Sequence, residues 1–135
     1  MTDPLVIILP YPPKALWPNA RPHHMEKHRH RKKYRIDAGL AAFAALNGQK
    51  PPQWNFALEQ STFYCKTKNF PDGDNATAAL KSGYDGLQDA QIVPNDRNVI
   101  HLPPRFEHDK QHPRVEIAIR ELTIQQFDDA LRGKA

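Results

Sequence analysis

Apolar residues recur along the chain with two different periods, which predict strands in some segments and helices in others. The longest apolar run, residues 5–9, has only the length of a strand and ends at Pro10. In residues 114–120 apolar and polar side chains alternate, as expected for a strand with one buried face. The segments predicted to be strands are residues 5–9, 56–66, 98–102 and 114–120.

A helix is predicted over residues 25–46, where Asn47-Gly48 favours its C-terminal end. Its first turns are basic, whereas Ile36, Leu40 and Phe43 recur at helical spacing in its second half. We therefore expect the second half to pack on the core and the first half to present cations. The other predicted helices are residues 75–87 and 123–131, the latter capped by Thr123, and residues 103–113 are expected to form a mobile hairpin connection.

This order of elements predicts an α+β (mixed α/β) fold, with two main helices packed on a small mixed sheet and a short C-terminal helix. The 135 residues fit a single domain, residues 1–135. The single cysteine, Cys65, can form no internal disulfide. No apolar run approaches the roughly 20 residues that span a bilayer, and no signal peptide is evident, so we expect a cytoplasmic protein without membrane contact.

The net charge of +4 is concentrated in one segment. Residues 21–35 hold seven Lys or Arg and one acid, Glu26, so this segment carries +6 and the remainder of the chain −2. A concentrated basic segment is expected where a protein binds a polyanion, although a solvated surface would explain it equally well. The residues predicted to contact nucleic acid lie within residues 19–35: Asn19, Arg21, Lys27, Arg29, Arg31, Lys32, Lys33 and Arg35.

Histidines and a tryptophan near the basic segment have more than one interpretation. His24 and His28 are four residues apart and could share a helix face as zinc ligands, but no Cys or Glu completes a known zinc spacing. We therefore favour a role in contacting phosphates. Trp17 could stack on an unpaired base, but pinning its loop to the core is the preferred interpretation.

An acidic motif, Asp72-Gly73-Asp74-Asn75, precedes the second predicted helix. If Asp74 begins that helix, Lys81 and Asp85 fall on the same face, about 20° to either side of it. Paired carboxylates suit a hard cation such as Mg²⁺, and Asp96, on a loop past the helix, is the best third ligand. The same motif is also a good turn and helix cap, and Lys81 with Asp85 could be a surface pair.

These motifs together resemble a known family. The segments that carry the resemblance are Leu9-Pro10-Tyr11-Pro12-Pro13, Pro18-Asn19-Ala20-Arg21, Asp72-Gly73-Asp74-Asn75, Leu80-Lys81, Asp85-Gly86-Leu87, Asp89-Ala90 and Pro94-Asn95-Asp96. In order and approximate spacing they resemble the RusA-type Holliday junction resolvases, especially the phage and prophage branch. The resemblance covers about residues 5–120.

The resemblance implies a homodimer that binds four-way DNA junctions and makes paired symmetric nicks with Mg²⁺, for which Mn²⁺ can substitute, in DNA recombination and repair. It assigns metal binding and catalysis to Asp72, Asp74 and Asp96, catalysis to Lys81, and supporting roles to Asn75 and Asp85. Two features depart from the family pattern. The gap between Asp74 and Lys81 is longer than in the shorter chromosomal members, and Asn95-Asp96 stands where the family often has two adjacent acids.

Two other function classes remain open from the sequence. The chain could be a non-catalytic DNA- or RNA-binding module whose acids serve only as turn and cap. It could also be a different metal-dependent phosphodiesterase that acts on RNA or nucleotides.

Overall fold

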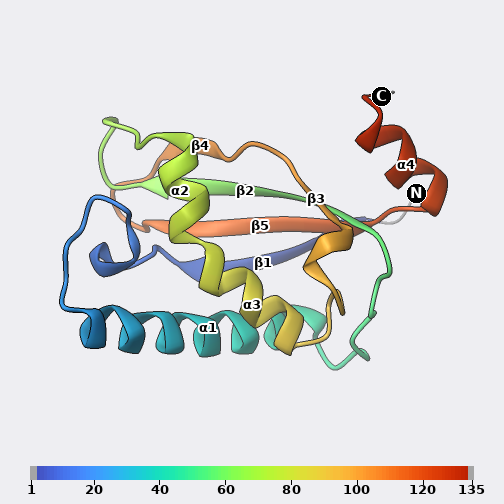
Figure 1. Cartoon of the computed structure of the whole chain (residues 1–135), viewed down its shortest axis with the longest axis horizontal. Coiled ribbons are helices and arrows are strands. Elements are labelled where there is room, and N and C mark those ends of the chain that lie inside the picture. The colour runs from blue at the N-terminus through green and yellow to red at the C-terminus, as the bar shows by residue number, and fades with distance from the viewer. Residues whose placement is uncertain (1–2, 134–135) are drawn as a thin grey trace.

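Two long strands with alternating burial form the centre of a five-stranded mixed sheet. β2 (Ala57–Cys65) and β5 (Arg114–Glu121) pair antiparallel and turn every second side chain into the core. β1 (Leu5–Pro10) pairs antiparallel with β5, whereas β3 (Val99–His101) and β4 (Arg105–His108) pair parallel with β2. The computed structural model describes residues 3–133, and its sheet has the order β1-β5-β2-β3, with β4 also on β2 (Figure 1).

Helices cover one face and one side of this sheet. The helical elements are η1 (Lys14–Leu16), α1 (His24–Leu46), α2 (Gly73–Ala79), α3 (Lys81–Asp89), η2 (Asp96–Asn98) and α4 (Ile124–Leu131). In Figure 1, α2 and α3 cross in front of the strands, α1 runs alongside β1 and α3, and α4 lies at the opposite end from α2 and β4. The α+β fold predicted from the sequence is thus confirmed.

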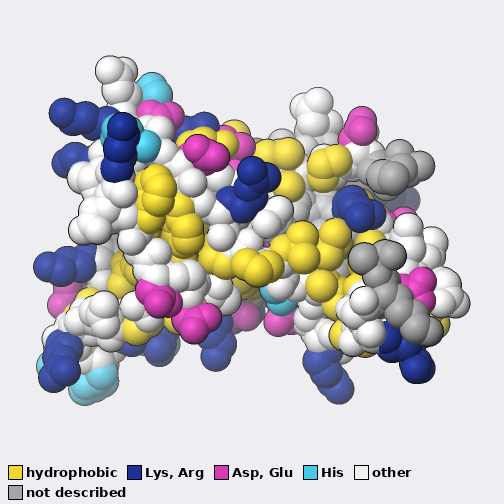
Figure 2. Space-filling view, turned by 90° about the horizontal axis from the view of Figure 1, so that it is seen from above, with side chains coloured by type: hydrophobic (Ala, Val, Ile, Leu, Met, Phe, Trp, Pro, Cys, Tyr) yellow, Lys and Arg dark blue, Asp and Glu magenta, His cyan; other side chains and the backbone are white. Residues whose placement is uncertain are grey.

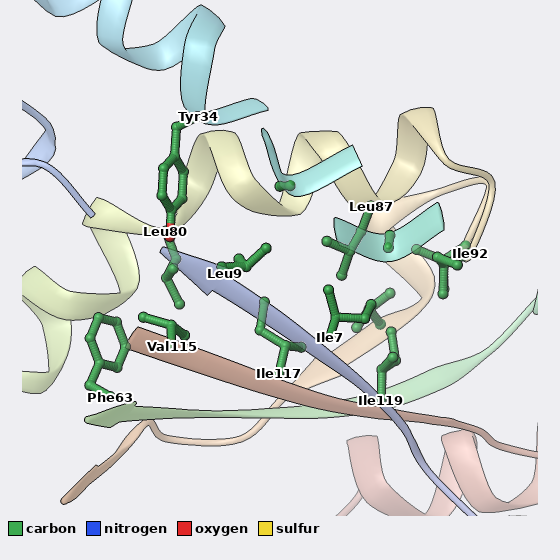
Figure 3. Close-up of a cluster of buried hydrophobic side chains, with 14 of the residues drawn as sticks. Ile7, Leu9, Tyr34, Phe63, Leu80, Leu87, Ile92, Val115, Ile117 and Ile119 are labelled. Atoms are coloured by element: carbon green, nitrogen blue, oxygen red, sulfur yellow. The ribbon is translucent and has the colours of Figure 1, made fainter. Parts of the chain in front are cut away.

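The core forms where the inward side chains of the sheet meet α1 and α3 (Figure 3). Leu80 and Leu87 are buried and Tyr84 is partly buried against the same core. The buried side chains labelled in Figure 3 are Ile7, Leu9, Tyr34, Phe63, Leu80, Leu87, Ile92, Val115, Ile117 and Ile119. Thr123 caps α4 through a capping box with Gln126, as expected for its position before the helix.

Two predicted elements were wrong in detail. The single helix predicted over residues 75–87 is two helices, because the chain tightens at Leu80, whose N–H lies 3.2 Å from the carbonyl oxygens of both Ala76 and Thr77. The loop predicted over residues 103–113 contains β4, whose backbone is held by its parallel pairing with β2. β4 forms because β2, which is distant in the sequence, pairs with it. Its four residues do not alternate strongly, so they give no local strand signal.

The expected packing face of α1 was also wrong. Ile36, Leu40 and Phe43 are 52%, 64% and 69% exposed, whereas the buried positions are Tyr34, Ala38, Ala42 and Leu46. At Ala38 the two helices approach closely, since a Cβ on Gly86 of α3 would lie 2.8 Å from the Ala38 Cβ. Ile36, Leu40 and Phe43 form an exposed stripe on the outer side of α1.

Candidate functional site

The acidic motif sits at the start of α2, and its first carboxylate is a helix cap. Asp72 Oδ1 accepts hydrogen bonds from the backbone N–H groups of Asp74 at 2.8 Å and Asn75 at 3.3 Å. The Asp74 side chain is exposed in the first turn and makes no hydrogen bond within the described residues. A helix N-terminus favours such negative charge. The cap interpretation is therefore correct for Asp72, while Asp74 remains available to a ligand.

The third candidate carboxylate, Asp96, belongs to a hydrogen-bonded chain that reaches into the core. Asp96 Oδ1 is 3.1 Å from Nε2 of His101, and Nδ1 of the same ring is 2.7 Å from Oε1 of Glu59. Glu59 is 1% exposed and also accepts a hydrogen bond from the Tyr84 hydroxyl at 3.1 Å. Because both ring nitrogens face carboxylates, His101 satisfies both contacts only when doubly protonated. Asn95 takes a structural part here by capping η2.

The charges around His101 alter its pKa. Burial disfavours the charged ring, but the carboxylates of Glu59 and Asp96 outweigh burial and raise the pKa of His101 above its ordinary value. Burial, followed by the negative charge of Glu59, raises the pKa of Tyr84, so its hydroxyl stays protonated as the donor to Glu59. Glu59 Oε2 is buried without a hydrogen-bond partner among the described residues. A buried carboxylate of this kind needs its charged partner to be tolerated.

We expect His101→Gln to remove a pH dependence of folding stability. Since the folded pKa lies above the roughly 6.5 of an unfolded histidine, the charged ring stabilises the folded protein fully below about pH 6.5. This stabilisation is lost as the pH rises through the raised pKa. Urea unfolding between about pH 6 and pH 9 should show a steeper loss of stability for the wild type than for His101→Gln. His24→Gln, at an exposed position, is the control and should behave like the wild type. Equal slopes of unfolding free energy against pH for the wild type and His101→Gln would contradict the prediction.

A groove with basic walls lies between α1 and the junction of α2 with α3. Its volume is about 610 Å³. Lys81, from the helix that follows the acidic motif, and Asp85 both line it, so these two residues share a face as predicted. Asp74 does not line the groove, although Ala78 and Ala79 at the other end of its helix do. The cationic or basic residues of the groove are Lys27, His28, Arg31, Lys32, Arg35 and Lys81.

The groove includes only part of the predicted nucleic-acid contacts. Asn19, Arg21, Arg29 and Lys33 lie outside it. Lys33 Nζ instead forms an ion pair with Asp37 Oδ2 at 2.7 Å, one turn along α1.

Arg35 lines the groove but is already paired. Its Nε and Nη2 atoms donate to the two oxygens of Asp89 at 2.6 and 2.7 Å, linking α1 to α3. These hydrogen bonds, then the charge of Asp89, raise the pKa of Arg35. The cations of the groove left without an ion pair among the described residues are Lys27, Arg31, Lys32 and Lys81.

The described residues include suitable donors for the magnesium ion that the resemblance implies, but these donors are not assembled into a cluster. Asp72, Asp74 and Asp96 offer the carboxylate oxygens that this ion prefers. However, no three His, Cys, Asp or Glu side chains in residues 3–133 are grouped so that they could hold a metal ion. The arrangement therefore does not fit a metal held by three protein ligands. The same finding applies to the alternative zinc site of His24 and His28, within the part of the chain that the structure covers.

Sequence reasoning missed Glu59 and His101. The signal for Glu59 was present: it occupies an inward position of β2, where its neighbours at spacing two, Ala57 and Ser61, are also buried. An acid at such a position requires a charged or hydrogen-bonding partner. That partner is His101, which lies opposite Glu59 in the parallel pairing of β2 with β3. Only the register of the two strands identifies it.

The fold and these side chains define an α+β protein with an acidic helix start beside a basic groove. No family model matches the chain. A protein of Xylella fastidiosa (strain Temecula1 / ATCC 700964), described as uncharacterized, is 34% identical over 121 residues, which cover 88% of this chain and 78% of that protein. The chain belongs to the same family as this Xylella protein. None of the helices within residues 3–133 combines the length and apolar character that crossing a membrane requires.

Proposed function

We propose that this protein is a magnesium-dependent, structure-selective endonuclease that resolves four-way DNA junctions. The observation that carries the proposal is the groove, which joins Lys81 of the acidic-motif region to the cations of α1. The resemblance of the motifs to RusA-type resolvases supplies the reaction class. We further propose that the protein acts in the cytoplasm as a homodimer, in DNA recombination and repair.

The groove has the electrostatics of a site for a DNA backbone. Lys27, Arg31, Lys32 and Lys81 present unpaired positive charge from two sides of one groove, within the described residues. Such surfaces bind phosphates in a sequence-independent and salt-dependent manner. Asp74 lies one helical turn before Ala78, which lines the groove, so a backbone held there passes close to the start of α2. The groove thus supports delivery of a phosphate to the acidic motif.

The acidic motif supplies the chemistry that phosphodiester hydrolysis requires. Magnesium usually keeps several waters and is bound by one or two carboxylates together with substrate phosphate. Asp74 and the second oxygen of Asp72 are free for that role among the described residues. Lys81 would offset the extra negative charge of a pentacoordinate phosphate. Residues 3–133 hold no assembled three-ligand cluster, and a site of this kind needs none because the substrate itself provides ligands.

The exposed apolar stripe of α1 supports the homodimer. Ile36, Leu40 and Phe43 lie at helical spacing on one face, and each is more than half exposed. Contiguous exposed apolar residues of this kind mark protein contact surfaces. A two-fold dimer also matches a four-way junction, which presents two equivalent strands for paired cuts.

Cleavage of a labelled synthetic four-way junction tests the proposal. We expect symmetric nicks in opposing strands with Mg²⁺ or Mn²⁺, none with chelator, and much weaker cutting of a linear duplex of the same sequence. Tight junction binding without cutting under all metal conditions would favour the second candidate, a non-catalytic binding module. The cap formed by Asp72 is the observation that favours that candidate. Faster hydrolysis of RNA or nucleotides than of junctions would indicate the other phosphodiesterase class.

Two arginines of α1 provide a matched test of the groove. We expect Arg31→Ala, which removes a groove cation, to weaken junction binding roughly 5-fold and to reduce the salt dependence by about one charge. Arg29→Ala removes the same charge from an exposed position outside the groove and should have a smaller effect. Binding isotherms at several salt concentrations measure both. Equal losses for the two variants would show that net charge, not the groove, governs binding.

A further inference from the structure

An aromatic ring with an open face lies immediately before the acidic motif. Phe70 is in the loop between β2 and α2, two residues before Asp72, and it is 43% exposed. Its ring stacks on that of Phe106 in β4, with centroids 5.9 Å apart and planes inclined by 21°. The protein therefore supports one side of the ring and leaves much of the rest in water.

Phe106 fixes this ring to the core. The Phe106 and Phe63 centroids are 5.6 Å apart, and Phe63 is fully buried. Trp17 completes the inner part of the same aromatic cluster, 6.0 Å from Phe63, and its Nε1 donates to the Pro12 carbonyl at 3.1 Å. Trp17 thus pins its loop to the core, as preferred from the sequence. Phe70 is the member of the cluster that faces outward.

Exposed cations lie in the same loop as Phe70. Lys66 and Lys68 are exposed and form no ion pair with other residues of 3–133. Figure 2 views the molecule from above and shows a band of hydrophobic side chains bordered by both basic and acidic side chains. A supported aromatic ring whose own loop carries two exposed lysines has the chemistry that binds an unstacked nucleobase and its phosphates.

We propose that Phe70 stacks on an unpaired base of the DNA, beside the phosphate that the acidic motif receives. This inference rests on the proposed function and names the part of a branched substrate that the site recognises. At a branch point a base unstacks at lower cost than in a continuous duplex, so a stacking residue there gives preference for branched DNA. Phe70 precedes Asp72 by two residues in the chain, so a base stacked on Phe70 would lie near the start of α2.

The test measures binding rather than cutting, in chelator, with four variants. The ligands are a four-way junction carrying 2-aminopurine at the crossover, a single-stranded oligonucleotide, and a linear duplex. Phe70→Ala and Phe70→Leu should weaken binding to the junction and single strand roughly 10-fold and leave duplex binding within about 2-fold. Phe70→Trp should bind like the wild type, because it keeps a stacking face. Phe127→Ala, which removes the α4 ring of the Phe56–Phe127 pair, is the control.

The outcomes separate this inference from the proposed function. Wild-type-like binding by Phe70→Leu would show that apolar volume suffices and would overturn stacking, as would an equal loss for all three ligands. A partner protein as the true occupant would give no effect of any Phe70 variant on DNA, which also overturns the inference. A wild type that never cuts junctions with Mg²⁺ refutes the nuclease proposal alone, since the single-strand comparison still measures stacking. A wild type that binds no DNA refutes both.

Discussion

Asp74→Asn is expected to abolish magnesium-dependent junction cleavage, by at least about 100-fold, while the folded protein still binds the junction. The Asp74 carboxylate is exposed, and no hydrogen bond within residues 3–133 occupies it. Asparagine has nearly the same shape but lacks the charge that attracts a hard cation. Because a negative charge near the phosphates is removed, binding should be equal or tighter. Cleavage rates over a range of Mg²⁺ concentrations and junction affinity in chelator measure the two effects.

The choice of Asp74 over Asp72 follows from the helix cap. Substitution of Asp72 alters the hydrogen bonds to the N–H groups of Asp74 and Asn75, so lost activity could reflect a disturbed α2. Asp129→Asn, in α4 at the other end of the molecule, is the matched control for loss of one carboxylate (Figure 1). Full cleavage by Asp74→Asn would remove Asp74 from the proposed site. Loss of cleavage in Asp129→Asn as well would point to a general effect of charge.

Gly86→Ala is expected to destabilise the protein by about 1–3 kcal/mol, because α1 and α3 touch at this residue. A Cβ at Gly86 would lie 2.4 Å from the Arg35 carbonyl oxygen, 2.8 Å from the Ala38 Cβ and 2.9 Å from the Gly39 nitrogen. Two of these atoms are backbone, so the helices themselves must separate. The better helix propensity of alanine, about 1 kcal/mol, offsets only part of this cost. Urea denaturation should show the loss, together with a melting temperature lower by roughly 5 °C or more.

The facing glycine of α1 is the control. A Cβ at Gly39 would have its nearest contact at 3.4 Å, the Gly86 carbonyl oxygen, so Gly39→Ala should remain within about 1 kcal/mol of the wild type. Separation of the helices would also widen the groove, since Lys81 and Arg31 stand on its opposite walls. Gly86→Ala should therefore weaken junction binding more than Gly39→Ala does. A Gly86→Ala protein as stable as the wild type would mean that the two helices adjust without cost.

The sequence predicted the elements whose signals are local. Strict alternation in residues 114–120 identified β5, and Thr123 identified the start of α4, because these patterns depend only on neighbours in the chain. β4 and the break at Leu80 were not predictable in this way. The first depends on pairing with β2, and the second on how two short helices pack against α1 and the sheet.

The candidate site likewise combines features that neighbouring residues encode with features that only the tertiary structure creates. The sequence by itself determined that two carboxylates open a helix and that a basic segment opens another, since both features are runs of neighbouring residues. Only the tertiary structure decided that Lys81 meets the cations of α1 in one groove, and that His101 joins Asp96 to the buried Glu59. It also decided that α1 turns Ala38 and Ala42 inward and Ile36, Leu40 and Phe43 outward. Glu59 and His101 are 42 positions apart, and strand register and helix separation, which no local pattern encodes, bring such residues together.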